Sequence, residues 1–234
     1  MKIAIYSITR DRLDYTKECF ASLRANAGQP FDHFVIDNGS QDGTLRWLRN
    51  EYKPTAFWYF GENRGISLAS NFALRAILNT FYGTGRNYDL ICKIDNDCLI
   101  TTPAIFNTFK AIYATDEAQR WVLSPRVEGI NRQPKRVRQH QIAGYQIGVT
   151  AIVGGLFHVV PAAIYREFMA DGGYDESLPL AHGQDDQFMD WLARKSYAKG
   201  YVEEISVQHY RGTDQQAKDY PEYFERKWAE ERQP

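Results

Sequence analysis

The sequence predicts an α/β fold in which helices cover both faces of a mostly parallel central sheet, in three layers. Apolar runs and amphipathic segments alternate four times within residues 1–100, which is typical of a doubly wound, Rossmann-like sheet. Each of the four apolar runs ends in a polar cluster, as strands do where a sheet binds its ligand. With 234 residues, of which 44% are hydrophobic, the chain is long enough to fill the core of one domain.

The first hundred residues are expected to hold four parallel strands with helices between them. The strands are predicted over residues 2–9, 31–36, 56–60 and 90–94. The helices are predicted over residues 13–25, 40–48 and 67–80. Ser40 is the expected N-cap of the second helix, because its hydroxyl can accept a hydrogen bond from a backbone N–H of the first turn.

The second half of the chain has a less regular pattern. Strands are predicted over residues 121–127, within residues 146–160 and over residues 201–209. Helices are predicted over residues 103–114, 161–169 and 185–196, and from Pro221 onward. The last helix carries Tyr223, Phe224 and Trp228 on its apolar side, and this side could pack either on the domain or on a partner.

The one basic cluster of the chain lies within residues 126–148, a segment with few large apolar side chains. This composition predicts an exposed loop. A solvated loop surface is the favoured explanation of the charge, and contact with a phosphate or an anionic acceptor is the alternative.

Composition and charge argue against several classes of protein. The formal net charge of −1 does not suit a protein that binds nucleic acid or a membrane over much of its surface. Cys19, Cys92 and Cys98 have no CxxC spacing, so they are expected to be reduced core thiols in a cytoplasmic protein. No apolar stretch approaches the length that crosses a membrane, so no transmembrane anchor is expected.

Two carboxylates lie at the end of the fourth predicted strand, in the sequence Asp95-Asn96-Asp97. Asp-x-Asp in an extended chain places both side chains on one side of the backbone, where they can share a hard cation such as Mg²⁺ or Mn²⁺. The same three residues also suit a plain turn at the end of a strand.

The four polar clusters that follow the predicted strands are expected to meet. They are Thr9–Arg12, Asp37–Ser40, Asn63–Gly65 and Asp95–Asp97. Parallel strands bring their carboxyl ends to one edge of the sheet, so these clusters should line a single crevice.

In its motifs the chain resembles the family 2 glycosyltransferases of the GT-A fold. Similar segments in the first half are TRDR, VIDNGSQDGT, ENRGISLASN and KIDND. In the second half they are VGGLFHVV, GGYDESL, GQDDQF and SVQHYRG. The chain departs from the family pattern at TRDR, where Thr-Tyr-Asn-Arg is usual, at Ser70, where arginine is common, and at Gln184, where glutamate is common. The resemblance implies that residues 1–100 bind a nucleotide sugar and that residues 101–234 bind the acceptor.

The resemblance also implies a donor site and a divalent metal, Mn²⁺ or Mg²⁺. Donor contacts fall on Thr9, Arg12, Asp37, Asn38, Asn63, Gly65, Asn71, Lys93, Asp95 and Asn96. Within this set, Thr9 and Asp37 would contact the nucleobase. Asp97 would bind the metal directly, Asp95 would hold the ribose or a metal-bound water, and His209 would complete the protein ligands. The metal would neutralise the charge that grows on the departing diphosphate.

A general base and an acceptor site are implied in the second half. The motif places the base on Asp185, and a shift of one residue would place it on Asp186. Either aspartate could instead be a helix N-cap. Gly154, Gly155 and Asp186 are the implied acceptor contacts. A single base without a second nucleophilic carboxylate suits direct displacement with inversion at the anomeric carbon.

Other readings stay open beside inverting glycosyl transfer. A sugar-phosphate nucleotidyltransferase would share the sheet, but residues 7–15 lack its glycine-rich phosphate loop. A glycosidase could use paired carboxylates, and a non-catalytic nucleotide-sugar or carbohydrate-binding protein would need no base. UDP is the leading nucleotide by resemblance. The acceptor is open among a glycan, a lipid-linked precursor, a protein, a small molecule and a modified nucleic-acid base, and so is the oligomeric state.

Overall fold

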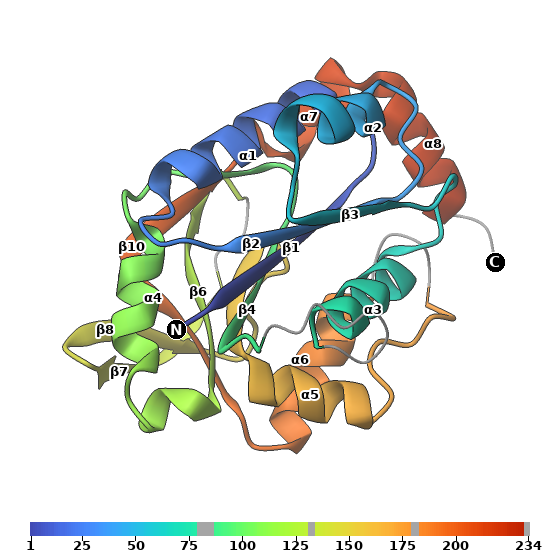
Figure 1. The fold of residues 1–234 in the computed structure, drawn as a ribbon. Helices are drawn as coiled ribbons and strands as arrows, with labels where there is room; N and C mark the ends of the chain where they lie inside the picture. The colour runs from blue at the N-terminus through green and yellow to red at the C-terminus, as the bar shows by residue number, and fades with distance from the viewer. Residues whose placement is uncertain (79–86, 131–133, 179–182, 232–234) are drawn as a thin grey trace.

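A computed structural model describes residues 1–78, 87–130, 134–178 and 183–231. Its strands form one ten-stranded sheet with the order β3-β2-β1-β4-β9-β6-β10-β8-β7, and β5 pairs with β10 (Figure 1). Since β9 lies between β4 and β6, strands from both halves of the chain contribute to this sheet.

The first half follows the predicted alternation. Its strands are β1 Ile3–Thr9, β2 Asp32–Asp37, β3 Ala56–Tyr59 and β4 Leu90–Ile94. Its helices are α1 Leu13–Asn26, α2 Thr44–Trp47, which continues as the π-helical turn Leu48–Tyr52, and α3 Ile66–Ile77. The pairs β1–β2, β1–β4 and β2–β3 are all parallel, as predicted, so the carboxyl ends of these strands lie at one edge. The last residues of the predicted third helix lie outside the described residues.

The prediction that Ser40 caps a helix is wrong. The helix begins later, at Thr44, after Gly43 with a φ of 96°. Asp42 takes over the capping role, because its Oδ1 accepts hydrogen bonds from both the N–H and the hydroxyl of Thr44. The hydroxyl of Ser40 instead accepts a hydrogen bond from the N–H of Asp11 at 2.8 Å, which joins two strand ends.

The second half adds strands of mixed direction. These are β5 Cys98–Ile100, β6 Trp121–Glu128, β9 Phe157–Pro161 and β10 Ala198–His209. Strand β6 pairs parallel with β10, whereas β9 runs antiparallel to β4 and β6. The helices are α4 Ile105–Tyr113, the 3₁₀ turn Glu117–Arg120, α5 Ala162–Ala170 and α6 Gln184–Arg194.

The basic segment is not the exposed loop that its composition predicts. It forms a hairpin of β7 Arg136–Ile142 and β8 Tyr145–Thr150, and β8 pairs antiparallel with β10. The side chains of β7 are mostly exposed, so they give no apolar alternation from which a strand can be recognised. Gly144 at the turn has a φ of 86°, a conformation that glycine adopts without strain.

Helices cover both faces of the sheet and form two hydrophobic cores, as the three-layer prediction requires. On one face α1 and α4 pack through Phe20, Leu23, Phe106 and Phe109. On the other face α3, α5 and α6 pack through residues such as Leu74, Phe168 and Phe188. Cys19, Cys92 and Cys98 are free and buried, as expected of core thiols.

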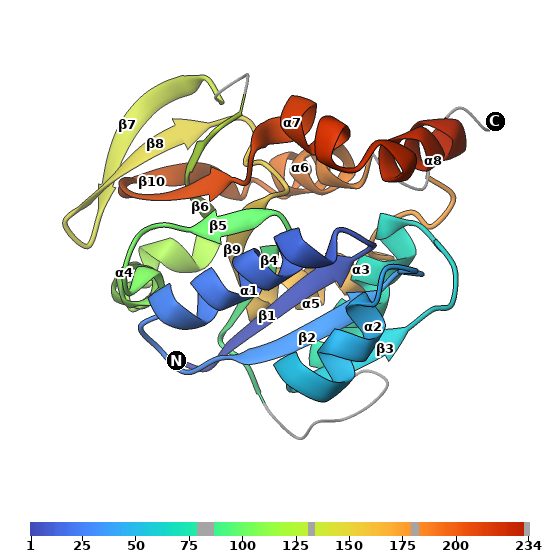
Figure 2. The ribbon, with the colours of Figure 1, turned by 90° about the horizontal axis from the view of Figure 1, so that it is seen from above.

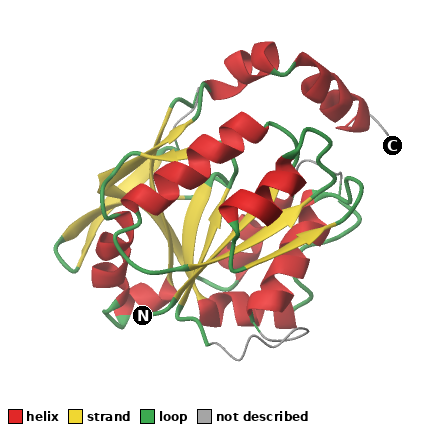
Figure 3. Cartoon of the chain, turned by 45° about the horizontal axis from the view of Figure 1, so that its top comes forward, coloured by secondary structure: helices red, strands yellow, loops and turns green. Residues whose placement is uncertain are grey.

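Two helices follow β10 and lie across the carboxyl edge of the sheet, where they run in a row in Figure 2 and stand apart from the central layers in Figure 3. They are α7 Gly212–Asp219, which was not predicted, and α8 Pro221–Glu231, which begins at Pro221 as predicted. Within the residues that the structure describes, none of the helices is long and apolar enough to cross a membrane.

Candidate active site

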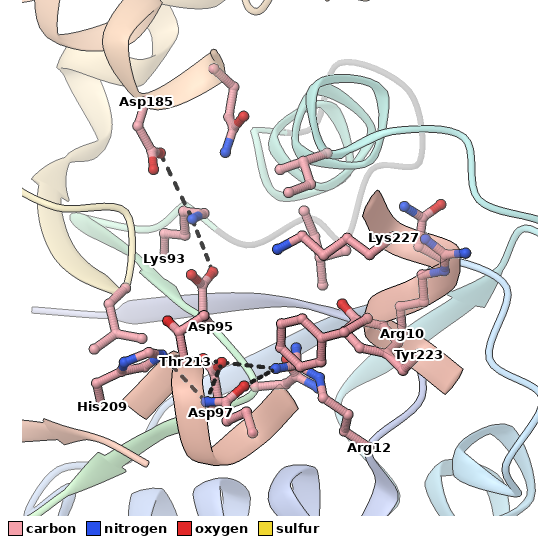
Figure 4. A pocket seen from close by; sticks show the side chains of 18 of the residues that line it. Arg10, Arg12, Lys93, Asp95, Asp97, Asp185, His209, Thr213, Tyr223 and Lys227 are labelled. Carbon is pink, nitrogen blue, oxygen red and sulfur yellow. Dashed lines mark hydrogen bonds and ion pairs between the residues drawn. The ribbon is translucent and has the colours of Figure 1, made fainter. Parts of the chain in front are cut away.

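A pocket of about 350 Å³ lies at the carboxyl edge of the sheet (Figure 4). Residues from all four strand-end clusters line it, together with residues from α6, β10, α7 and α8. Nine predicted site residues meet here: Arg12, Asn38, Asn63, Lys93, Asp95, Asn96, Asp97, Asp185 and His209. The expected convergence of the four clusters on one crevice is therefore present in the structure.

The Asp-x-Asp pair follows β4 directly. The N–H of Asp95 donates to the Leu156 carbonyl at 2.9 Å, and the Asp95 carbonyl accepts from Cys98 to close the turn into β5. Burial raises the pKa of Asp95. Burial also acts to raise the pKa of Asp97, but the Arg12 guanidinium and the His209 side chain outweigh it and hold that pKa well below its usual range.

Arg12 is a buried cation beside this pair. It lies at the N-cap of α1 with a φ of 58°, a left-handed conformation that is uncommon for residues other than glycine, and its side chain lines the pocket. Its guanidinium donates to Asp97 Oδ2 and to Asn96 Oδ1, both at 2.9 Å, and to Gln216 Oε1 at 2.6 Å. The ring of Tyr223 covers it, with its centroid 4.8 Å from Cζ.

Lys93 connects the two halves of the site. Its Nζ donates to the Gly155 carbonyl at 2.7 Å and pairs with Asp95 Oδ1 at 2.9 Å. Asp185 Oδ1 lies 3.9 Å from the same Nζ. Burial acts to lower the pKa of Lys93, but the carboxylates of Asp185 and Asp95 outweigh it, so the ammonium stays charged. Figure 4 shows Lys93 between the two carboxylates.

A His209 ring nitrogen and an Asp97 carboxylate oxygen, both of types that bind metals, lie close together in the pocket. His209 is the register partner of Cys98 in the β10–β5 pair, which places its ring beside Asp97. His209 Nε2 lies 3.4 Å from Asp97 Oδ2, and its hydrogen bond to Asp97 raises the pKa of His209. The described residues contain no group of three or more His, Cys, Asp or Glu side chains that could hold a metal. The two side chains fit a cation that takes its other ligands from phosphate oxygens, as Mg²⁺ commonly does.

The first turn of α6 approaches Lys93 from the opposite wall. Asp185 lines the pocket, whereas Asp186 is exposed and does not. A Cβ added to Gly155 would lie 1.9 Å from Asp185 Oδ2, so only glycine permits this close approach. The Oε1 of Gln184 is buried with no hydrogen-bond partner, and Gln184 lines the same pocket. A ligand hydroxyl would satisfy it.

The second and third strand ends are joined by an amide pair. Asn38 Nδ2 donates to Asn63 Oδ1 at 2.8 Å, and Asn38 Oδ1 accepts from the N–H of Arg64 at 2.9 Å. Gly65 begins α3 with a φ of 84° and donates its N–H to Asn63 Oδ1 at 3.2 Å. Gly65 supports this corner from outside the pocket lining.

Five further predicted residues also lie outside the pocket lining, and one of them is Gly155, whose carbonyl accepts from Lys93. Thr9 and Asp37 are fully buried below it and hydrogen bond to each other at 3.1 Å. Asn71 is buried in α3, where it donates to the Tyr174 carbonyl and accepts from the Tyr174 N–H. Gly154 has open space where a side chain would stand. The binding roles given to these residues stay predictions.

Several lining residues were not singled out as site residues from the sequence. They are Ile8, Arg10, Ile66, Ile130, Leu156, Gln184, Thr213, Gln216, Tyr223, Phe224 and Lys227. Thr213 and Gln216 lie on α7, whose polar sequence gave no signal of a helix. The apolar side of α8 was recognised, but the sequence could not show that it faces the pocket. None of the described basic residues within 126–148 lines the pocket.

Comparison with known proteins places this chain in a family. The sequence model described as Glycosyl transferase family 2 matches residues 5–171. No curated protein matches the chain by sequence. Staphylococcus aureus TarS 1–349 in complex with UDP-GlcNAc has a TM-score of 0.64 and 16% identity, over 89% of this chain and 58% of that chain.

Two further solved structures share the fold at low identity. The mannosyltransferase PcManGT from Pyrobaculum calidifontis, in complex with GDP-Man and Mn²⁺, has a TM-score of 0.60 and 13% identity over 88% of this chain and 56% of that chain. GalNAc-T7 with UDP, GalNAc and Mn²⁺ has a TM-score of 0.65 and 11% identity over 91% of this chain and 43% of that chain. This chain spans less than two thirds of the length of each of the three proteins. It belongs to glycosyl transferase family 2, and it shares the GT-A fold of these structures.

Proposed function

We propose that this protein transfers a sugar from a nucleotide-sugar donor to an acceptor hydroxyl, with inversion at the anomeric carbon and with a divalent metal, Mn²⁺ or Mg²⁺. The observation that carries the proposal is that the Asp-x-Asp pair, His209 and Asp185 line one pocket at the carboxyl edge of the sheet. A UDP-sugar is the preferred donor by resemblance, and solved structures with this fold hold UDP-GlcNAc, UDP and GDP-Man.

The charges of the pocket suit the departure of a nucleoside diphosphate. Asp97 and His209 would hold the metal, which supplies Lewis-acid stabilisation of the charge on the leaving diphosphate when it is bound. Asp95 stands beside them with its carboxylate paired to Lys93, so it can accept a hydrogen bond from the donor without leaving an unpaired charge. Arg12 is held in place by three side-chain acceptors and adds fixed positive charge.

Asp185 is the proposed general base. It reaches the pocket from the opposite wall to the strand ends, where an attacking acceptor hydroxyl could give up its proton. Lys93 Nζ lies 3.9 Å from Asp185 Oδ1, so a positive charge stands beside the proposed base. Asp186 is proposed only as an acceptor contact, because it is exposed outside the pocket.

The test is donor breakdown. The purified protein is incubated with a panel of UDP- and GDP-sugars and Mn²⁺, with and without mixed sugar acceptors, and released nucleoside diphosphate is measured by mass spectrometry. The expected result is release from one donor that an acceptor stimulates and that is strongly reduced in Asp185→Asn. Donor binding without release, in the wild type and with every acceptor, would instead indicate a binding protein.

A further inference from the structure

Helix α8 supplies a wall of the pocket that the family match does not cover, since the match ends at residue 171. Tyr223, Phe224 and Lys227 of this helix all line the pocket. In Figure 4 the Lys227 side chain extends from α8 towards the middle of the pocket, across from Asp95. The wall therefore adds a cation and aromatic rings to a site whose acids come from the sheet.

Ion pairs with the strand ends fix the position of α8. Glu230 makes two hydrogen bonds to the guanidinium of Arg10, at 2.5 and 2.6 Å, and accepts a third from Asn63 at 2.8 Å. Arg226 pairs with Asp11 at 2.6 Å. These bonds hold the helical turn that carries Lys227, and the Lys227 ammonium lies 5.8 Å from the centroid of the Phe224 ring in the same wall.

Lys227 adds an ammonium to the pocket lining opposite the strand ends (Figure 4). Asp97 is paired with Arg12, and Asp95 with Lys93, so each of these carboxylates has a cation beside it. An anionic group of the donor could therefore lie between the strand ends and α8. A lysine binds phosphate as a compact point charge with three donors.

We propose that Lys227 binds the diphosphate of the nucleotide-sugar donor, which makes α8 a donor-binding element of this chain. The inference rests on the proposed function. Tyr223 is a positioning residue in the same wall, because its ring covers the guanidinium of Arg12 and keeps that cation beside Asp97. In this proposal Lys227 contacts the leaving group directly, and Tyr223 acts on it indirectly by positioning Arg12.

The experiment compares ligands that differ only in the diphosphate. Binding of UDP and uridine, and of GDP and guanosine, is measured by titration calorimetry with Mn²⁺ for wild type, Lys227→Ala and Lys227→Arg. Lys218→Ala is the matched control, because Lys218 is an exposed lysine of α7 that does not line the pocket. Thermal unfolding of each variant checks that it is folded.

Lys227→Ala should weaken binding of the nucleoside diphosphate about tenfold or more, the usual worth of a hydrogen bond to a charged group, and leave nucleoside binding unchanged. Lys227→Arg should restore most of the affinity, and Lys218→Ala should match wild type. If wild type binds a diphosphate and Lys227→Ala binds it equally well, or loses nucleoside binding to the same extent, only the role of Lys227 is overturned. If wild type binds no nucleotide, the proposed function fails first.

Discussion

The two sides of the pocket are held in the fold by different forces. Lys93 lies in β4, and Asp95 and Asp97 come directly after it. Strand β4 lies between β1 and β9 in the middle of the sheet, and all its residues are buried. Helix α8 has one buried apolar side chain, Phe224, and also attaches through ion pairs, hydrogen bonds and the contact of the Tyr223 ring with the Arg12 guanidinium. Backbone hydrogen bonds and apolar packing hold the sheet side of the pocket, with or without a ligand. Interactions of charged side chains hold α8, the helical wall.

This difference assigns separate tasks to the two sides. The groups proposed for chemistry lie on the sheet and at the start of α6, where packing can hold them to the tolerance that catalysis needs. The groups on the wall are proposed to bind and enclose the donor. Substitutions on the sheet side should therefore reduce turnover or global stability, and substitutions on the wall should change donor affinity or local order.

The largest effect is expected at Asp185. Asp185→Asn should reduce turnover by roughly 10²- to 10⁴-fold, the usual contribution of a positioned base, and leave donor affinity unchanged. Asp186→Asn is the comparison, because its side chain is exposed outside the pocket. Steady-state kinetics with a saturating donor decide between them. A severe loss in Asp186→Asn with normal turnover in Asp185→Asn would move the base by one residue.

The next effect is expected at the proposed metal ligand. Asp97→Asn keeps an acceptor for Arg12 but removes the charge that would bind Mn²⁺. The gain in nucleotide affinity that Mn²⁺ provides should fall by at least the roughly 10- to 100-fold that loss of an outer-shell partner costs. Calorimetry with Mn²⁺ and with EDTA measures this gain. The same Mn²⁺ dependence in wild type and variant would remove Asp97 from the metal site.

A stability comparison of two buried lysines tests the sheet side itself. Lys93→Met leaves Asp95 and Asp185 without their cation and should cost about 2 kcal/mol of unfolding free energy. This is less than the 3–5 kcal/mol of a fully buried pair, because the two carboxylates are 39% and 35% exposed. Lys199→Met is the control, since Lys199 is also buried but donates to the Met189 carbonyl. Urea unfolding should show the larger loss for Lys93→Met, and equal losses would count against the carboxylate pairing.

On the wall the expected effect is smaller and local. Glu230→Gln weakens a pair whose side chains are 16% and 25% exposed, and should cost about 1 kcal/mol. Hydrogen exchange of α8 amides should then become about fivefold faster, with little change in the sheet. Glu225→Gln, on the exposed side of the same helix, should leave exchange unchanged. Equal protection in the two variants would show that α8 is not held by its ion pair with Arg10.

The smallest expected effect is a pH dependence of stability that arises from the pair of His209 and Asp97. The hydrogen bond to Asp97 raises the pKa of His209 in the folded protein. The contribution of this pair to stability is complete below the unfolded-state pKa, about 6.5, and is lost as pH rises through the folded-state pKa. Without metal, wild type should therefore lose more stability than His209→Gln between pH 6 and pH 9 in urea unfolding. Identical slopes would mean that the pair is not charged.

The sheet side of the site could be predicted from the sequence because local patterns determine it. Apolar runs identify the strands, parallel pairing aligns their carboxyl ends, and the polar residues that follow are then brought together. Asn38, Asn63 and Asp97 reach the pocket for this reason. The same pattern does not tell which of these polar side chains line the pocket. Thr9 and Asp37 lie outside the lining and hydrogen bond to each other.

The helical wall could not be predicted because no local pattern determines it. Residues 212–219 have almost no apolar side, and the buried Gln216 side chain hydrogen bonds to Arg12 and Asp97. Partners so far apart in sequence leave no periodicity to recognise. The hairpin of residues 136–150 was mistaken for a loop for a similar reason, since one of its strands faces solvent.

The most direct test of the whole account is a thermal-shift measurement of the wild-type protein with nucleoside diphosphates and nucleotide sugars, with and without Mn²⁺. A ligand at about 100 times its Kd should stabilise the folded protein by about 2.7 kcal/mol, which raises Tm by about 5 to 10 °C. The account predicts a rise of this size for one nucleotide, larger with Mn²⁺ than with EDTA. No rise with any nucleotide at saturating concentration would contradict it.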